Sequence, residues 1–389
     1  MTFTLIHPLS VDPVPVASFA EESFAYSDAL SAALVRDAAV RAWPDLVALG
    51  FWLRRSNLEA IFAPYRAERV AFKPVGHVFH NAPSNVDSLF VYSGMLSFLA
   101  GNVNWIRLSS RAGGSAEVLL AKLGEVAHAF PRQASRFRLL HSTHESAELA
   151  ALVARVDARV LWGSDEAIAA QRRMAVPAHA RDVCFAHKFS LALLGAEALL
   201  AASEDELAAL VRLFARDNLT YAQQACSSAK AVVWLGARAA VAAAQARFWP
   251  ALAAEALTRA TLGPSDHYQA LANAQQIVLE TEGDVSLEVS PPFERLSVPS
   301  LAAAHTALHQ GCGLFVETRI DVLAELTPQL SSSHQTLSHW GISGDDLDAW
   351  FSTVLVGVDR LVPVGESLTF RPLWDGMDLI RQLTRQIAR

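Results

Sequence analysis

Apolar and polar residues recur along the chain with two periods, one typical of amphipathic helices and one typical of buried strands. Between residues 27 and 65 the apolar positions have helical spacing, and Pro44 is placed to open a second helix. From residue 69 onward, short apolar runs alternate with longer helical patterns. The pattern predicts strands within 70–83 and at 103–108, 137–140 and 158–162, separated by helices at 86–100, 116–129, 146–156 and 166–174.

The second half repeats this alternation with less regular spacing. We expect a strand over 184–194, a helix over 205–214, a strand over 231–235, and a long helix over 239–258 kinked or broken at Pro250. Residues 265–298 show alternating segments broken by proline. Helices at 301–309 and 320–330 flank a strand at 313–317, and a strand within 354–364 precedes a closing helix at 377–387. Strands joined by helical crossovers predict an α/β fold, with a doubly wound domain followed by a second α/β region that carries Cys226.

Ligands of doubly wound sheets bind at the carboxyl ends of the strands. That rule places residues 77–85, 107–111 and 163–165 on one rim and makes them the cofactor candidates. The sequence has no GxGxxG motif, so a dinucleotide site does not follow from a fingerprint.

The composition is that of a globular protein and argues against a nucleic-acid-binding, disulfide-rich or membrane-spanning one. The 389 residues are 52% hydrophobic and 18% charged, enough to build more than one core, and the net charge of -7 offers no general attraction for nucleic acid. Three widely spaced cysteines argue against a disulfide framework and favour a reducing compartment, the cytoplasm. We expect no secretory signal and no membrane span, because no apolar stretch reaches the length that a bilayer requires.

Cys226 is the residue with the strongest claim to covalent chemistry. It lies between polar Gln223-Gln224 and Ser227-Ser228, with Lys230 nearby and an apolar run following. Polar neighbours and a cation lower the pKa of a thiol, and the thiolate is the nucleophilic form. The alternative is a small buried hydrophobic residue, which is what most single cysteines are.

Several segments together resemble the LuxC-type acyl-CoA reductases, a branch of the aldehyde dehydrogenase superfamily. The segments follow the family's order from about residue 28 to the C-terminus: Trp43–Asn57, Gly76-His77, Asn85-Val86, Gly101-Asn102, Asp217, Gln223–Ser228, Gly357–Gly365 and Trp374–Gly376. The resemblance implies an aldehyde-dehydrogenase-like fold, with a Rossmann-type cofactor domain, an α/β catalytic domain and the thiol in the cleft between them. The implied domains are an N-terminal helical segment (1–68), an NAD(P)-binding domain (69–190), a catalytic domain (191–350) and a returning C-terminal segment (351–389).

The chemistry implied by the resemblance is reduction of an acyl thioester, with Cys226 as the nucleophile. Asn85 matches the asparagine whose amide holds the oxyanion in the superfamily, although Ser84 or Asn85 could instead cap a helix. Hydrolytic relatives carry a general-base glutamate where this chain has Ala186–Ser190, without a carboxylate. An acyl-enzyme without that base is poorly hydrolysed, which favours a reductase.

The same resemblance places the cofactor. Arg107 takes the position of a superfamily lysine and Ser110 that of a ribose-binding glutamate, within the segment Arg107-Leu108-Ser109-Ser110-Arg111. A hydroxyl flanked by arginines accepts a 2′-phosphate, so we expect NADPH rather than NADH, with a CoA thioester as substrate. Gly163, Ser164 and Asp165 match a turn that approaches the pyrophosphate, although Asp165 could be an ordinary helix cap. Glu288 loosely matches the glutamate that holds the nicotinamide ribose.

Other features have simpler interpretations. His141 and His144 lie at a strand-to-helix junction with no third ligand indicated, so we predict no metal site. Expected partners are an acyl-CoA, acyl-carrier or acyl-enzyme donor, an acyl-activating ligase or acyltransferase, and further copies of the chain. Two alternatives to the reductase stay open: an aldehyde dehydrogenase acting oxidatively, CoA-acylating or not, and a non-catalytic acyl-transfer scaffold.

Overall fold

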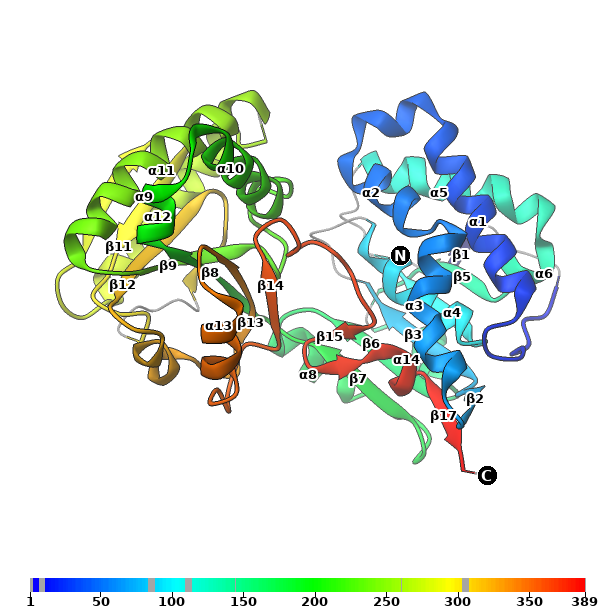
Figure 1. Ribbon diagram of the computed structural model, residues 1–389. Helices are drawn as coiled ribbons and strands as arrows, with labels where there is room; N and C mark the ends of the chain where they lie inside the picture. The colour runs from blue at the N-terminus through cyan, green and yellow to red at the C-terminus, as the bar shows by residue number, and fades with distance from the viewer. Residues whose placement is uncertain are drawn as a thin grey trace. The chain divides into compact units, whose positions relative to one another are not determined.

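The computed structural model describes residues 3–6, 11–82, 88–108, 114–143, 145–259, 261–302 and 308–388. The chain forms two compact units, one comprising Met1–His187 with Phe370–Arg389 and the other comprising Lys188–Thr369 (Figure 1). Each unit is built on its own largely parallel sheet with helices around it, which confirms the predicted α/β class.

The first unit has a six-stranded sheet in the order β1-β5-β4-β3-β6-β7. Its strands are β1 (Thr4–Ile6), β3 (His77–Asn81), β4 (Val103–Arg107), β5 (Phe137–His141), β6 (Ala158–Trp162) and β7 (Arg181–Phe185). All neighbours are parallel except β1, which runs antiparallel to β5. The chain moves outward from β3 through β4 to β5, and then returns to place β6 on the other side of β3. This reversal is the switch point at which doubly wound sheets bind ligands.

The helices of the first unit cover its sheet as the apolar pattern predicts. They are α1 (Glu21–Arg36), α2 (Pro44–Trp52), α3 (Arg55–Ala67), α4 (Leu89–Leu99), α5 (Gly114–Ala129), α6 (Pro131–Ala134), α7 (Ala147–Val153), α8 (Asp165–Arg172) and α14 (Leu379–Gln382). Pro44 is the first residue of α2, where its missing N–H and fixed φ cost nothing. Gly94 lets α4 approach the sheet, since a Cβ there would lie 2.8 Å from a methyl carbon of Ile106.

The second unit has a seven-stranded sheet in the order β10-β11-β12-β9-β8-β13-β14. Its strands are β8 (Phe189–Gly195), β9 (Ala229–Leu235), β10 (Ser286–Ser290), β11 (Phe293–Ser297), β12 (Leu314–Ile320), β13 (His334–Trp340) and β14 (Arg360–Pro363). Its helices are α9 (Ala196–Ala201), α10 (Glu204–Leu219), α11 (Arg238–Arg259), α12 (Pro264–Glu280) and α13 (Gly344–Phe351).

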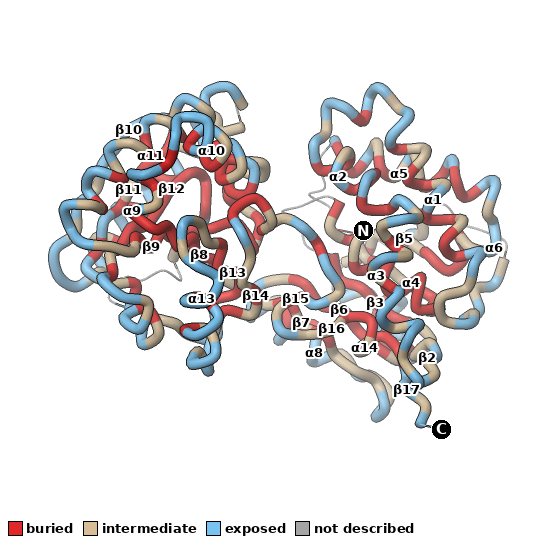
Figure 2. Tube along the Cα trace, in the orientation of Figure 1, coloured by how far each residue is buried: buried red, intermediate tan, exposed pale blue. Residues whose placement is uncertain are grey.

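The central strands of the second unit are apolar on both faces, so that successive side chains enter two different cores. On β9, Val232 and Trp234 pack with α10 and α11, whereas Ala231 and Val233 pack with residues of α12 and α13. In Figure 2 these strands are mostly coloured as buried, whereas the helices around them include more exposed residues. The sandwiched sheet fixes the starting point of β9, directly after the loop that carries Cys226.

Four predicted elements are wrong. The strand expected over 184–194 is two strands, β7 and β8, in the sheets of different units, separated at the polar pair His187-Lys188. Residues 265–298 begin with the regular helix α12, which buries Ala270, Ala274 and Ile277 at helical spacing, instead of alternating from the start. Only their second half fits the prediction, as β10 and β11 on either side of two prolines. Residues 320–330 form no long helix, because Pro328 cannot continue one, and two short 3-10 turns occur instead.

The closing helix expected over 377–387 is the fourth error. Only α14 is helical there, and β17 (Thr384–Ile387) pairs antiparallel with β2 (Ala71–Pro74). In addition, α11 runs unbroken from Arg238 to Arg259 with Pro250 inside it. The helix expected over 301–309 lies largely outside the described residues. Conversely, β6 has the predicted bounds, and α5, β4 and β5 match within two residues.

Candidate active site

Cys226 lies in the loop between α10 and β9, as the sequence predicts. Its thiol is not in a disulfide, and the residue is half-buried. The loop turns through Ala222 (φ 48°) and Gln223 (φ 62°), both in the left-handed region. The Gln223 side chain secures this turn, because its Nε2 donates to the Ala229 carbonyl at 2.8 Å and its Oε1 accepts from the Gly313 amide at 3.1 Å. The thiol is therefore presented by a backbone with fixed geometry.

Hydrogen bonds from three elements hold the residues around the thiol. The Ser190 hydroxyl on β8 donates to the Cys226 carbonyl at 2.7 Å and accepts from the Thr336 amide on β13 at 3.2 Å. On the other side, the Ser228 hydroxyl donates to the Asp217 carbonyl at 2.7 Å. The loop is thus tied to α10 and to β8, and through Ser190 to β13.

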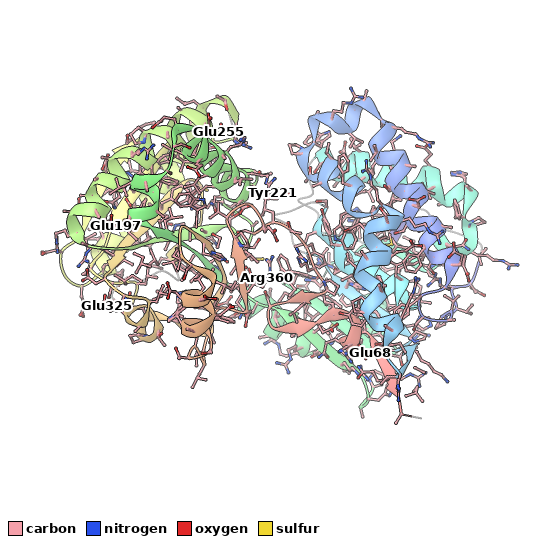
Figure 3. The ribbon with its side chains drawn as sticks, in the orientation of Figure 1. Glu68, Glu197, Tyr221, Glu255, Glu325 and Arg360 are labelled. Carbon is pink, nitrogen blue, oxygen red and sulfur yellow. The ribbon has the colours of Figure 1, made fainter. Side chains whose placement is uncertain are left out.

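Two motif residues, Asp217 near the end of α10 and Arg360 on β14, link this region to the segment around 360–367. The buried Asp217 carboxylate accepts from the amides of Gly365 at 2.6 Å and Ser367 at 3.2 Å, and burial raises the pKa of this carboxyl group. Arg360 on β14 donates to the Ser367 carbonyl at 3.1 Å and to the Thr336 hydroxyl at 3.3 Å. Figure 3 marks Arg360, together with Tyr221 at the start of the cysteine loop. The motif around 357–365 therefore has a structural role in bracing the strands beside the Cys226 loop.

Lys230 supplies the cation that the sequence suggested. It is the second residue of β9 and only 6% exposed, and burial lowers the pKa of its ammonium group. Cys226 and Cys312 act in the opposite direction and raise the Lys230 pKa, because a thiolate at either position stabilises the charged lysine. By the same reciprocity, the ammonium group favours the thiolate.

Gln335 is a site residue that sequence reasoning missed. It lies on β13, 109 positions after Cys226, and its Nε2 donates to the Cys226 sulfur at 3.5 Å. The side chain is fully buried. No local pattern around 334–340 distinguishes it from a core strand residue; only the parallel pairing of β8 with β9 and β13 brings it to the thiol.

Apart from Glu288, the cofactor candidates that the structure describes lie on or directly after β3, β4 and β6. Asn81 ties these three ends together: its Oδ1 accepts from Arg107 at 3.0 Å and its Nδ2 donates to the Trp162 carbonyl at 3.2 Å. Arg107 also donates to the Ser142 carbonyl at 2.9 Å, and burial lowers the pKa of its guanidinium group. Arg107 therefore reaches the rim at the switch point. Asn81 lies within the predicted rim segment 77–85, but its role in joining the three strand ends was not predicted.

The turn Gly163–Asp165 follows β6 and begins α8. The cap is Ser164 rather than Asp165, because the Ser164 hydroxyl accepts from the Ala167 amide at 3.3 Å. Asp165 is the first helical residue, with its carboxylate in the first turn. A cofactor pyrophosphate at this turn remains a prediction.

Other predicted site residues stay untested. Asn85, Ser109, Ser110 and Arg111 lie outside the described residues, as does His144. Glu288 is on the edge strand β10, where its side chain is 58% exposed and forms an ion pair with Arg295. In the stretch without a general base, Lys188 pairs with Asp359 at 3.2 Å and donates to the Ser332 carbonyl at 2.7 Å, which gives it a structural use.

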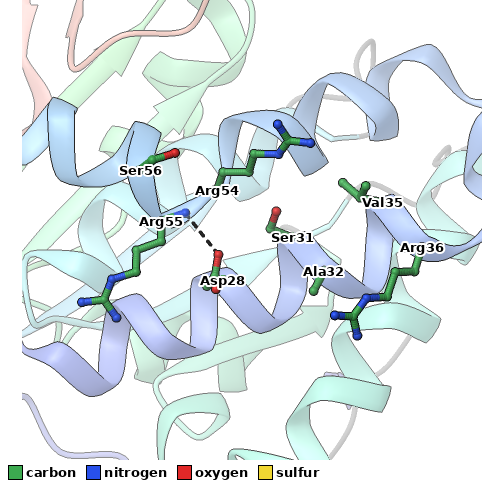
Figure 4. A pocket seen from close by; sticks show the side chains of 8 residues that line it. All are labelled: Asp28, Ser31, Ala32, Val35, Arg36, Arg54, Arg55 and Ser56. Atoms are coloured by element: carbon green, nitrogen blue, oxygen red, sulfur yellow. Dashed lines mark hydrogen bonds between the residues drawn. The ribbon is translucent and has the colours of Figure 1, made fainter.

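A shallow pocket of about 390 Å³ lies between α1 and the start of α3 (Figure 4). Its lining residues are Asp28, Ser31, Ala32, Val35, Arg36, Arg54, Arg55 and Ser56. The Asp28 carboxylate accepts from the Arg55 amide at 3.2 Å, so it already occupies the position where an anion would meet the helix start. The Arg55 guanidinium is likewise neutralised by Glu21 and Glu59.

The described part of the chain has neither a candidate membrane span nor a candidate metal site. None of its helices is both long enough and apolar enough to cross a membrane. Within the same residues, no group of three or more His, Cys, Asp or Glu side chains could hold a metal ion.

Several solved aldehyde dehydrogenases have a similar fold. Lactaldehyde dehydrogenase from Escherichia coli is 14% identical with a TM-score of 0.68, covering 94% of this chain and 85% of that one. A putative aldehyde dehydrogenase from Burkholderia cenocepacia is 15% identical with a TM-score of 0.69, covering 96% and 87%. An NAD-dependent benzaldehyde dehydrogenase from Corynebacterium glutamicum is 13% identical with a TM-score of 0.65, covering 95% and 84%. These likenesses confirm the aldehyde-dehydrogenase-like fold.

A search of the curated proteins found no match. The family model described as acyl-CoA reductase (LuxC) matches residues 55–285, more than half of the chain and including Cys226 with its loop. The chain therefore belongs to the LuxC acyl-CoA reductase family.

Proposed function

We propose that this protein reduces an acyl-CoA thioester to an aldehyde with NADPH, through an acyl group carried on Cys226. The observation that carries the proposal is the Cys226 thiol itself. It is half-buried on a braced loop, near the buried cation Lys230, inside the segment matched by an acyl-CoA reductase family. Buried structural cysteines have no such electropositive, partly accessible setting.

The site residues suit each covalent step. The Cys226 thiolate attacks the acyl carbonyl carbon, a new C–S bond forms, and the CoA sulfur leaves with the electron pair of the bond that breaks. Bound NADPH would supply the hydride that reduces the acyl carbon. The C–S bond to Cys226 then breaks, the aldehyde departs, and the sulfur recovers its negative charge beside Lys230. Asn85 is proposed to donate to the oxyanion in both steps.

The cofactor preference rests on residues at the rim of the first sheet. Arg107 reaches this rim, and Ser109, Ser110 and Arg111 follow it in sequence. Arginines beside hydroxyls suit a 2′-phosphate. Gly163, Ser164 and Asp165 are proposed to meet the pyrophosphate, and Glu288 the nicotinamide ribose. Initial rates with NADPH and NADH test the preference, and Arg111→Ala should reduce the ratio of their kcat/KM values by about tenfold or more.

Intact-mass spectrometry tests the proposal directly. The protein is incubated with acyl-CoAs of several chain lengths in the absence of NADPH. We expect a mass increase of one acyl group, which disappears with aldehyde release when NADPH is added. Cys226→Ala should abolish the adduct, whereas the matched variant Cys184→Ala should retain it, because Cys184 lies on β7 in the other unit and burial raises its thiol pKa.

The alternative functions predict different results from the same material. An oxidative aldehyde dehydrogenase would reduce NAD(P)⁺ with an aldehyde, in the presence or the absence of CoA, faster than it oxidises NADPH with any acyl-CoA. A scaffold subunit would form no adduct and would show no selective labelling of Cys226. Either result would overturn the reductase proposal.

A further inference from the structure

We infer that Gln335 is the hydrogen-bond donor that stabilises the Cys226 thiolate and orients its sulfur. The inference deepens the proposed function, since it rests on Cys226 being the nucleophile. Gln335 Nε2 lies 3.5 Å from Sγ, within the range for an N–H donor to sulfur, and both residues belong to the same compact unit.

The orientation of the amide follows from a chain of donors. Arg360 can only donate, and it donates to the Thr336 hydroxyl at 3.3 Å. That hydroxyl in turn donates its own proton to Gln335 Oε1 at 3.2 Å. With the amide oxygen engaged on this side, the NH₂ group faces the sulfur. The charge of Arg360 thus polarises a relay that ends at the nucleophile.

Burial gives this contact its strength. Gln335 and Thr336 are at most 1% exposed, so water does not compete for the amide. Ser190 fixes the other end of the cysteine, because its hydroxyl donates to the Cys226 carbonyl and also lies 3.5 Å from Gln335 Oε1. Backbone and side chain of Cys226 are therefore positioned by one connected network across β8 and β13.

The chemical consequence concerns the charged form of the sulfur. An amide N–H stabilises a thiolate more than a thiol, so the donor lowers the thiol pKa. The same contact also assists the final step, in which the C–S bond breaks and negative charge returns to sulfur. Removing the donor should raise the thiol pKa by about one unit, which reduces the thiolate fraction near neutral pH about tenfold.

The test measures the pH dependence of Cys226 alkylation by iodoacetamide, followed by mass spectrometry of the peptide that contains it. Gln335→Met keeps the size of the side chain but removes the donor. Gln335→Glu replaces the donor with an acceptor that carries charge. We expect the midpoint to rise by about one unit in Gln335→Met and further in Gln335→Glu, with the plateau rate at high pH unchanged.

Two variants keep the test decisive. Thr336→Val removes the hydroxyl that anchors the amide oxygen and should raise the midpoint by a smaller amount. Gln245→Met is the matched control, because its amide donates to Glu317 at 2.8 Å in the same unit and it should leave the midpoint unchanged. Circular dichroism identifies the variants that fold.

Unchanged midpoints in folded Gln335→Met and Gln335→Glu would overturn the inference. So would equal increases in Gln335→Met and Gln245→Met, because these would indicate a general loss of packing. Alkylation requires neither acyl-CoA nor NADPH. A wild-type protein that forms no acyl adduct would therefore refute the proposed function without affecting this measurement.

Discussion

Acid should weaken the first unit through His80, a histidine buried on β3. Its ring is 1% exposed, and Nε2 lies 3.0 Å from the Asn104 oxygen. The Asn104 amide group donates to two backbone carbonyls, so its oxygen accepts the proton of His80 Nε2. Nδ1 then has no hydrogen-bond partner among the described residues. Protonation there would bury an uncompensated cation, and burial accordingly lowers the His80 pKa from 6.5 to about 4.

The direction and size of the effect follow from linkage. Between these two values the unfolded chain binds a proton that the folded chain excludes, so the free energy of unfolding falls as the pH drops from 6.5 towards 4. The full difference corresponds to about 3 kcal/mol, of which about 2 kcal/mol is lost by about pH 5. Stability is regained above pH 6.5, where the ring is neutral in both states.

Denaturant unfolding at about pH 7.5 and about pH 5 measures this loss. His80→Gln keeps a donor for Asn104 but removes the titrating ring, so it should lower stability at the higher pH while losing about 2 kcal/mol less than the wild type on acidification. His128→Gln, an exposed position on α5, serves as the matched control. An equal acid loss in the wild type and His80→Gln would refute the reasoning.

Two further changes test the surroundings of the thiol. Lys230→Met removes a buried cation, so we expect the free energy of unfolding to rise by about 1 kcal/mol or more. Cys226 alkylation near neutral pH should slow about tenfold, because the thiolate loses a nearby positive charge. Slower alkylation without a higher denaturation midpoint would contradict the idea that burial of the Lys230 charge destabilises the fold. Asp217→Ala leaves the Gly365 and Ser367 amides without their acceptor. The free energy of unfolding, measured with denaturant, should therefore fall by about 2–4 kcal/mol. A fall below about 0.5 kcal/mol would show that water replaces the carboxylate as acceptor.

The sequence by itself was sufficient to predict the elements whose boundaries depend on short-range conformational preferences. The apolar run of β6 between polar turns, Pro44 at the start of α2 and the polar loop before β9 all carried their own signals. The proposal of Cys226 as the nucleophile came from its polar neighbours and from the resemblance of its segment to a family, because one reactive residue in a recognisable segment is enough to suggest covalent chemistry.

Tertiary structure decided the features that depend on which segments meet. Residues 384–387 form a strand because β2 offers unpaired backbone groups there, and this outweighs the helical pattern. The apolar run around 184–194 divides between two sheets, which no periodicity could reveal. Gln335 reaches Cys226 only because β8 pairs with both β9 and β13. The hydrophobic pattern of a sequence indicates which residues are buried. It does not indicate which strands pair, and strand pairing determines which distant residues form hydrogen bonds with one another. The surroundings of the Cys226 thiol therefore depend on the tertiary structure.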